Sequence, residues 1–243
     1  MTPKIIAHRG ARGLWPENSL DGFRRALALG IAAVEFDVHP TRDGGLAVIH
    51  DPLLERTTSG TGPVAERTLE ELAALRLKGA EEGVPSFEAV LDVFAEVPVE
   101  MHIELKADSR GGAYPGLEEA VLARLAARGL EARAVLTSFL PEVLERLRAL
   151  RPRAPLLASL NAASAARLGG LESALETLER VSPRYIAVEK GLLAEEFTRL
   201  HARIGAERLG VWTVNEPDEI ARWLAMPLAT LTTDRPDRAL GRA

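Results

Sequence analysis

The chain has 243 residues, 47% of them hydrophobic, and its 35 acidic and 30 basic residues give a net charge of −5. This length and apolar content allow one sizeable core, and the acidic balance argues against a nucleic-acid-binding protein. The absence of cysteine excludes disulfides and thiolate metal sites.

The first ten residues contain an apolar run of only three residues, whereas a secretory signal needs roughly 7–15. No stretch reaches the roughly 18 uncharged residues of a membrane-spanning helix. We therefore expect a cytoplasmic protein without an integral membrane segment. The lack of glutamine and the many charged residues are typical of heat-adapted proteins, although a GC-rich genome favours a similar composition.

Apolar runs rich in β-branched residues alternate with amphipathic patterns along most of the chain. The apolar runs predict strands at 4–8, 32–38, 99–106, 133–138, 156–160, 185–189, 209–214 and 229–233. The amphipathic patterns predict helices at 20–29, 87–95, 117–128, 141–150, 171–181, 194–204 and 217–225. Ser19 and Ser86 fit the N-cap positions of the first two helices. This alternation predicts an α/β fold, a closed (β/α)8 TIM barrel formed by residues 1–243 as one domain.

Residues 39–85 interrupt the alternation between the second strand and its helix. Connections in such folds usually have roughly 2–6 residues, so this segment is an insertion with its own role. It contains a further apolar run at 46–49 and the capping-box pattern Thr68-Leu-Glu-Glu71. We expect the insertion to cap the mouth of the barrel.

Side-chain alternation in two strands directs acidic groups toward the barrel axis. In Val34-Glu35-Phe36-Asp37-Val38 the apolar residues would face the helices, which turns Glu35 and Asp37 inward. The same alternation turns Glu104 inward in the strand 99–106. Active sites of such barrels lie at the carboxyl ends of the strands, where these three carboxylates would meet.

Three converging carboxylates repel one another, and a divalent cation would remove that repulsion. Oxygen ligands without cysteine suit Mg²⁺ or Ca²⁺ rather than zinc, and Mn²⁺ is a further candidate. The sequence therefore predicts a metal site formed by Glu35, Asp37 and Glu104. The alternative is a polar inner layer that Arg9 and Lys106 neutralise.

Two histidines are predicted at the same mouth. His8 ends the first strand with inward parity. The turn signal Arg42-Asp43-Gly44-Gly45 predicts a hairpin whose paired residue numbers sum to 87, which places His50 opposite Asp37. Because the ordinary pKa of histidine is about 6.5, such a pair suits general acid–base catalysis.

The remaining candidates concern substrate binding. Arg9, as a bidentate fork, and Lys106, as a point charge, suit a phosphate. Trp212 ends a predicted strand and is either a core residue or a wall of the substrate pocket. His102 lies deeper in the barrel and His39 lies in the hairpin arm, so both are placed outside the site.

With these residues identified, the chain resembles the glycerophosphodiester phosphodiesterase family. The matching motifs run in order along nearly the whole chain: His8-Arg9-Gly10, Pro16-Glu17-Asn18, Glu35-Phe36-Asp37-Val38, Thr41-Arg42-Asp43-Gly44, His50-Asp51-Pro52, Arg56-Thr57-Thr58-Ser59-Gly60-Thr61-Gly62, Val84-Pro85-Ser86-Phe87, Ile103-Glu104-Leu105-Lys106, Ser138-Phe139, Trp212-Thr213-Val214-Asn215 and Thr233-Asp234-Arg235-Pro236. Thr137, where a serine is more usual, is a mild variant outside the catalytic positions.

The resemblance implies an enzyme of lipid and glycerol metabolism that cleaves glycerophosphodiesters, its small-molecule partners, to an alcohol and sn-glycerol 3-phosphate. It implies the following roles: His8 and His50 as the acid–base pair, Glu35, Asp37 and Glu104 as metal ligands, and Arg9 and Lys106 as phosphate contacts. It also places Glu17 at the rim of the site, where anchoring the first loop is an alternative role.

Two other functions stay open. A related lyase would form a cyclic phosphate from a lysophospholipid-like substrate, and a non-catalytic barrel would only bind an anion. The sequence does not indicate the oligomeric state.

Overall fold

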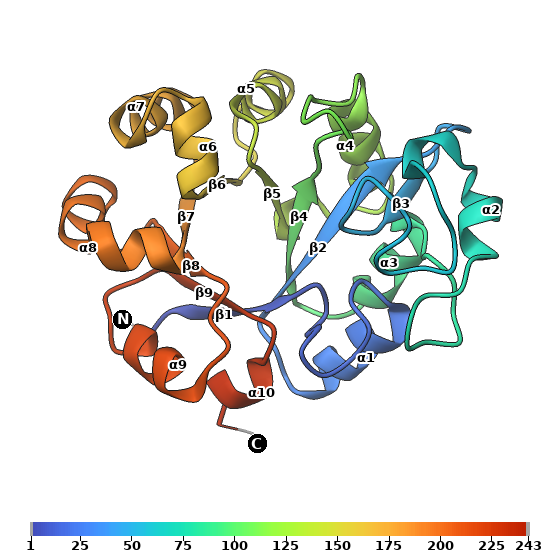
Figure 1. Ribbon diagram of the computed structural model, residues 1–243, viewed down its shortest axis with the longest axis horizontal. Coiled ribbons are helices and arrows are strands. Elements are labelled where there is room, and N and C mark those ends of the chain that lie inside the picture. Colours follow the sequence, from blue (N-terminus) through green and yellow to red (C-terminus); the bar gives the residue numbers. More distant parts are fainter. Residues whose placement is uncertain (1, 242–243) are drawn as a thin grey trace.

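Eight parallel strands close into a barrel in the computed structural model, which describes residues 2–241 (Figure 1). These strands are β1 (Lys4–His8), β2 (Ala33–Pro40), β4 (Glu100–Leu105), β5 (Ala134–Ser138), β6 (Leu156–Leu160), β7 (Tyr185–Glu189), β8 (Leu209–Trp212) and β9 (Thr230–Thr233). Strand β1 pairs with both β2 and β9, which closes the barrel and confirms the predicted (β/α)8 fold.

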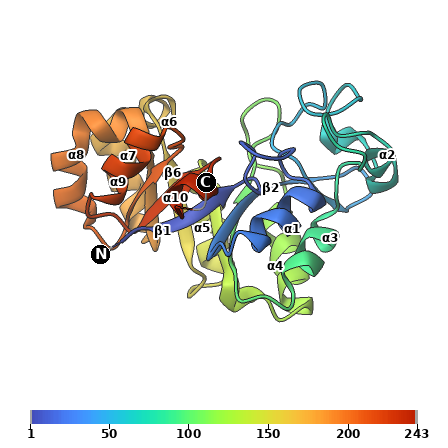
Figure 2. The same ribbon diagram turned by 90° about the horizontal axis from the view of Figure 1, so that it is seen from below.

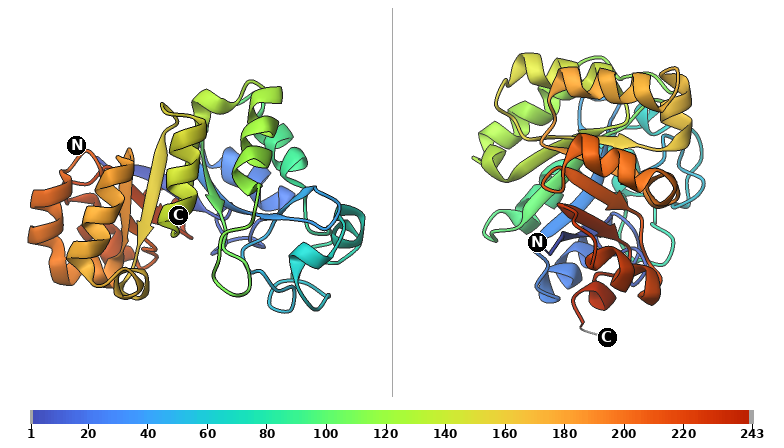
Figure 3. Two further views of the ribbon diagram at one scale, coloured as in Figure 1. Left: turned by 90° about the horizontal axis from the view of Figure 1, so that it is seen from above. Right: turned by 90° about the vertical axis from the view of Figure 1, so that its left-hand side faces the viewer.

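The helices lie outside the strands, as the two views of Figure 3 show. The predicted helices correspond to α1 (Leu20–Ala28), α3 (Phe87–Phe94), α4 (Leu117–Ala127), α5 (Pro141–Leu150), α7 (Leu171–Val181), α8 (Lys190–Ile204) and α9 (Pro217–Leu224). Ser19 and Ser86 accept hydrogen bonds from the backbone of Gly22 (3.0 Å) and Ala89 (3.1 Å), which confirms both N-caps.

Two short helices were missed because neither is long enough to show a helical periodicity. These are α6 (Ala162–Arg167) and α10 (Pro236–Ala239). Helix α6 begins at a capping box in which Asn161 accepts from the backbone of Ser164 at 2.8 Å. Helix α8 begins four residues earlier than predicted, at Lys190, because the Glu189 side chain accepts hydrogen bonds from its first turn. Within residues 2–241, none of the helices has the length and apolarity needed to cross a membrane.

The main core lies between the barrel and its helices. Phe36 of β2 is fully buried, and its ring contacts Phe23 of α1 (5.7 Å between centroids), Phe87 of α3 (6.1 Å) and Phe94 of α3 (6.2 Å). Burying a side chain of this size contributes roughly 1.5–3 kcal/mol. The outward direction of Phe36 confirms the predicted strand parity, which leaves Glu35 and Asp37 facing the axis.

The insertion forms a hairpin whose register differs by one residue from the prediction. Strand β3 (Leu46–Val48) pairs antiparallel with β2, and the partners, such as Val38 and Val48, sum to 86 rather than 87. The turn has three residues instead of two or four, because Thr41 pairs with Gly45 through a 3.0 Å hydrogen bond. Gly44 adopts a φ of 79°, the left-handed conformation that completes such a three-residue loop.

The rest of the insertion packs around a small core of its own. Helix α2 (Leu69–Ala73) and the 3₁₀ helix η1 (Val64–Glu66) each contribute a residue to this core, and Figure 2 shows α2 at the outer edge of the molecule. The Thr68–Glu71 capping box is present, as predicted. The core consists of Ala47, Ile49, Leu54, Val64, Leu72, Leu77 and Val84. A hydrophobic cluster of this kind gives the insertion a defined shape rather than that of a loose loop.

At the amino-terminal end of the barrel, Glu100 forms ion pairs with residues of neighbouring segments. Its carboxylate lies 2.9 Å from Lys4 Nζ of β1, 2.9 Å from His102 Nε2, and 3.7 Å from Arg184, just before β7. Partial burial would raise the pKa of Glu100, but His102 and Lys4 outweigh it and lower the pKa to about 2. This arrangement lies at the amino-terminal ends of the strands, opposite the predicted site, and fixes one ring nitrogen of His102.

We expect Glu100→Gln to lower the melting temperature at neutral pH. The pKa of Glu100 is depressed in the folded state, from 4.5 to about 2, so its stabilising effect is present above pH 4.5 and is lost as pH falls toward 2. Thermal denaturation followed by circular dichroism from pH 7 to 2 should show the gap between variant and wild type closing. Glu142→Gln, on the exposed face of α5, is the control. A gap independent of pH would contradict this role.

Candidate active site

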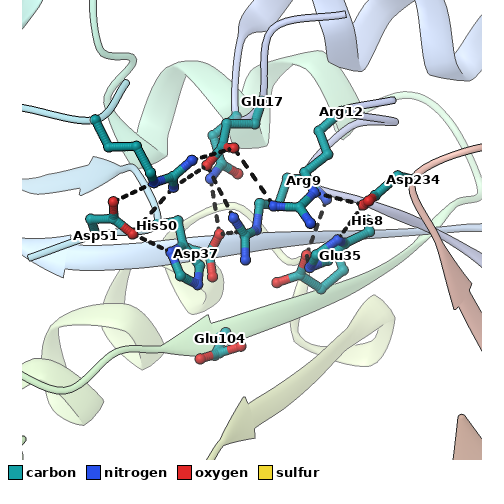
Figure 4. Close-up of polar contacts among 12 residues, drawn as sticks. His8, Arg9, Arg12, Glu17, Glu35, Asp37, His50, Asp51, Glu104 and Asp234 are labelled. Atoms are coloured by element: carbon teal, nitrogen blue, oxygen red, sulfur yellow. Dashed lines mark hydrogen bonds and ion pairs between the residues drawn. The ribbon is translucent and has the colours of Figure 1, made fainter. Parts of the chain in front are cut away.

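The predicted residues meet at the carboxyl ends of β1, β2 and β4 (Figure 4). The strand register pairs His8 with Glu35 and Asp37 with Glu104, so neighbouring strands bring these four side chains together. One oxygen from each of the three carboxylates lies within 4.8 Å of the others. The clustering inferred from strand parity is therefore present in the fold.

The three carboxylates have unlike electrostatic environments. Glu35 is 8% exposed, and burial together with the charges of Asp37 and Glu104 raises its pKa well above the usual range. Burial would also raise the pKa of Asp37, but Lys106 and Arg9 hold it far below the usual range. Lys106 Nζ lies 3.4 Å from Asp37 Oδ1 and 2.6 Å from Glu104 Oε1. The cluster is thus only partly neutralised by protein cations.

The free oxygens of this cluster fit a divalent cation. Asp37 Oδ2 accepts a hydrogen bond from Asn18 Nδ2 at 2.9 Å. In residues 2–241, Glu35 Oε1 and Asp37 Oδ1 are buried without a hydrogen bond, and Asp37 Oδ1 has only the 3.4 Å ion pair with Lys106. Leaving buried acceptors unsatisfied costs roughly 1–3 kcal/mol each. A bound cation would satisfy both, so the residues present can hold a divalent metal ion.

His8 is oriented by a carboxylate from the last strand connection. Its Nδ1 lies 2.5 Å from Asp234 Oδ1, and because a carboxylate only accepts, Nδ1 carries the proton. Asp234 also accepts from Arg12 Nε (2.8 Å) and Asn215 Nδ2 (2.7 Å). In the neutral ring Nε2 is then left as the proton acceptor, 3.8 Å from Glu35. Burial lowers the pKa of His8, and Asp234 partly opposes that effect.

His50 has an equivalent partner in the insertion. Its Nδ1 lies 2.5 Å from Asp51 Oδ1, and Asp51 in turn accepts a hydrogen bond from Arg56. Although the register differs by one, His50 reaches the site because Ile49 N donates to the Asp37 carbonyl at 3.1 Å. Burial lowers the pKa of His50, and the charge of Asp37 only partly opposes this effect. The two histidines line the same cavity.

Arg56 connects the insertion to the first loop. Its Nη2 lies 2.7 Å from Glu17, and Glu17 also binds Arg9 at 3.1 Å. Glu17 therefore lies at the rim, where it anchors the first loop to the insertion through Arg56. A chain of hydrogen bonds and ion pairs runs from His50 through these residues toward Asp37, which lies 3.4 Å from Arg9 Nε.

The central cavity has a volume of about 310 Å³. Arg9 and Trp212 line it, and Trp212 forms part of the wall with Phe139, at 5.4 Å between ring centroids. Lys106 instead lines a second cavity of about 310 Å³, which also touches His50 and Glu104. His102 forms part of the floor of the central cavity.

Sequence reasoning missed the orienting groups. Asp51 directly follows His50 and could have been suspected, but Asp234 is 226 residues away from His8 and only barrel closure pairs them. His39, placed outside the site, is fully buried and supports it from behind, because its Nε2 bonds the His50 carbonyl at 3.1 Å. Its Nδ1 contacts the Tyr114 hydroxyl at 3.2 Å, and burial lowers the pKa of His39 to about 4.

Residues 8–238 match the Glycerophosphoryl diester phosphodiesterase family. The chain belongs to this family. The match confirms the resemblance inferred from the motifs and the prediction of a phosphodiesterase enzyme.

Relatives of known sequence agree with the family match. A glycerophosphodiester phosphodiesterase of Bacillus altitudinis is 33% identical over 98% of this chain and 96% of its own length. Another, of Caldanaerobacter subterraneus subsp. tengcongensis, is 37% identical over 57% of this chain and 59% of its own length.

Solved structures share the fold. A provisionally named glycerophosphoryl diester phosphodiesterase of Agrobacterium tumefaciens has a TM-score of 0.88 at 27% identity, covering 99% of this chain and 97% of its own. An Oleispira antarctica phosphodiesterase, solved in complex with the product sn-glycerol-3-phosphate, has a TM-score of 0.83 at 24% identity, covering 99% and 96%.

Replacing Arg56 by lysine should impair turnover. The guanidinium binds Asp51 through Nε and Glu17 through Nη1 and Nη2, and one ammonium group cannot span both carboxylates. We expect kcat to fall about tenfold or more, the usual effect of losing an orienting partner, with a smaller change in KM. Steady-state kinetics would measure this. Arg42→Lys, another insertion arginine paired with a glutamate, is the control. Equal kinetics for both variants would contradict the role.

Proposed function

We propose that this family member hydrolyses glycerophosphodiesters to an alcohol and sn-glycerol 3-phosphate, using a divalent cation and two histidines. The observation that carries the proposal is the convergence of His8 and His50, each oriented by an aspartate, on one cavity beside three carboxylates. The product found in the Oleispira antarctica relative supports this choice of substrate.

Glu35, Asp37 and Glu104 would hold the cation. Their oxygens suit Mg²⁺ or Ca²⁺, with Mn²⁺ as a third candidate. When bound, the cation supplies positive charge that stabilises the phosphate in the transition state. This cation would also compensate the repulsion that raises the pKa of Glu35.

Arg9 and Lys106 would bind the phosphate from the protein side. Arg9 Nε makes no hydrogen bond among the residues the structure describes and has only the 3.4 Å ion pair with Asp37, so its N–H is available as a donor. Both side chains are charged, because Asp37, Glu35 and Glu104 raise the pKa of Arg9, and Glu104 and Asp37 raise that of Lys106, against the effect of burial.

The histidines would move the protons. One Nε2 removes the proton from the attacking hydroxyl while phosphorus forms a bond to that oxygen. The bond to the alcohol oxygen breaks, and the other histidine protonates that oxygen. Asp234 and Asp51 fix the ring orientations and stabilise the imidazolium forms. The attacking hydroxyl belongs to water, which gives sn-glycerol 3-phosphate directly, or to the substrate glycerol. In the second case a cyclic phosphate forms first, and water then opens it to sn-glycerol 3-phosphate.

We also propose that residues 39–85 cap the barrel mouth and limit which alcohol fits. The segment contributes His50, Asp51 and Arg56 to the site, and its Pro52 lines the cavity that contains Lys106. The cytoplasmic location remains a prediction from the sequence.

Removal of divalent ions should abolish release of glycerol 3-phosphate, and Mg²⁺, Mn²⁺ or Ca²⁺ should restore it. In parallel, calorimetric titration with Mn²⁺ should show that Asp37→Asn weakens metal binding, because this change removes a ligand charge. Asp92→Asn, on the outer face of α3, should bind Mn²⁺ like the wild type. Full activity in a verified metal-free preparation would rule out the metal requirement.

His8→Ala and His50→Ala should each lower kcat by roughly 10²–10⁴ while Mn²⁺ affinity changes little. Because burial lowers the pKa of both rings, the acid limb of kcat/KM should lie below pH 6.5, and activity should fall as the base becomes protonated. His201→Ala on α8 is the control. Near-normal kcat in either site variant would remove that histidine from the mechanism. Accumulation of a cyclic phosphate, seen by phosphorus NMR, would instead indicate a lyase.

A further inference from the structure

A small cavity outside the reaction site separates the first loop from the insertion. It has a volume of about 160 Å³, several times the roughly 30 Å³ that one water occupies in the liquid. Three basic side chains, one carboxylate, one hydroxyl and one indole line it: Arg12, Arg56, Lys78, Glu17, Thr57 and Trp15. The chain as a whole is acidic, so this concentration of positive charge is local.

Among residues 2–241, Lys78 is the one cation of this cavity that lacks a carboxylate partner. Arg12 binds Asp234 and Arg56 binds Asp51, and both aspartates face the histidines of the central cavity. Glu17, in the lining itself, accepts from Arg56 at 2.7 Å and lies 3.9 Å from Arg12. Lys78 has no carboxylate within ion-pair distance among residues 2–241, and its Nζ donates only to the Glu55 carbonyl at 2.7 Å. The lining still holds three cations against one carboxylate, and a bound anion would compensate this excess of positive charge.

Thr57 provides a second and independent observation. Its Oγ1 is buried and has no hydrogen-bond partner in the described part of the chain. The backbone holds Thr57 beside Lys78, because Lys78 N donates to the Thr57 carbonyl at 2.8 Å. A buried hydroxyl without a partner destabilises the fold, and an acceptor oxygen in the adjacent cavity would satisfy it.

We propose that this cavity is a binding site for a phosphate-type oxyanion. A phosphate monoester carries about −1.5 to −2 charges at neutral pH and several acceptor oxygens. This charge matches the excess of three cations over one carboxylate in the lining, and Thr57 adds a hydroxyl donor. A carboxylate group brings one charge, and Glu17 already supplies one. The bound oxyanion would lie close to the reaction site, because Arg12 lines both this cavity and the central one.

The oxyanion can come from two sources. It is either free inorganic phosphate or a phosphate group on the alcohol part of the substrate. The second source rests on the proposed function, whereas binding of free phosphate does not depend on it.

Calorimetric titration with inorganic phosphate in the presence of Mg²⁺ tests the site directly. Lys78→Met should weaken one binding event about tenfold, the usual effect of losing a charged hydrogen-bond donor, and Thr57→Val should weaken it by a smaller factor. Thr57→Val should not lower the melting temperature, since the hydroxyl it removes has no partner. Lys190→Met, which removes an equal charge near Glu219, is the control. Phosphate binding that is the same in wild type and both variants would overturn the proposal.

Kinetics then distinguish the sources. For a substrate phosphate, a glycerophosphodiester with a phosphorylated alcohol should show a higher kcat/KM than the same diester without that phosphate, and Lys78→Met should abolish only this preference. For free phosphate, added inorganic phosphate should change the wild-type rate and leave Lys78→Met unaffected. Absence of turnover with both diesters would contradict the proposed function, while the calorimetric result would still decide the anion site. If neither added inorganic phosphate nor a phosphorylated alcohol changes the rate, the proposed role of this cavity in binding a phosphate group is wrong.

Discussion

The site depends on the burial of Asp37 at the carboxyl end of β2. This carboxylate is 1% exposed, and its ionised state is stabilised by Asn18, Arg9 and Lys106. These partners come from the first loop and from the end of β4, so one charge fixes the positions of two connections. The Asp37 carbonyl also accepts from Ile49, which brings the adjacent His50 to the same place. Removing a partner of a buried charge would leave it uncompensated, which explains why two cations and an amide converge on Asp37.

Around this centre the fold builds two similar units, each a histidine, an aspartate and an arginine. In one, Asp234 follows β9 and binds His8 and Arg12; in the other, Asp51 in the insertion binds His50. The first unit rests on the rigid barrel and the second on a hairpin. Arg56 and Glu17 compensate for that difference, because they bind the hairpin back to the loop that contains Arg9. The insertion therefore contributes side chains to the site and is attached to the first loop of the barrel.

Arg12 and Arg56 also give the rim of the site a basic cavity. Arg12 and Arg56 serve carboxylates of the reaction site on one side and line a separate basic cavity on the other. The arginines that hold the aspartates beside the histidines thus also line the proposed anion site. Lys78 and Thr57 belong to that cavity alone, which makes the two roles experimentally separable.

The sequence by itself determined the barrel and the inward direction of Glu35, Asp37 and Glu104. Strand alternation has a period of two, so apolar neighbours such as Phe36 reveal which side chains must face the axis. Parity and the position of His8 at a strand end were enough to predict that these side chains lie together at the barrel mouth. The N-caps at Ser19 and Ser86 were likewise local features, readable without the fold.

Tertiary structure decided the rest. The pairing of His8 with Asp234 requires closure of β1 against β9, a contact between chain ends that no local pattern encodes. The hairpin register required the left-handed conformation of Gly44, which a glycine permits but does not impose. The supporting bond from His39 and the bridge by Arg56 depend on how the insertion packs. The sequence determined side-chain direction because this follows from local geometry, whereas the partners of each charged group emerged only when distant segments packed together.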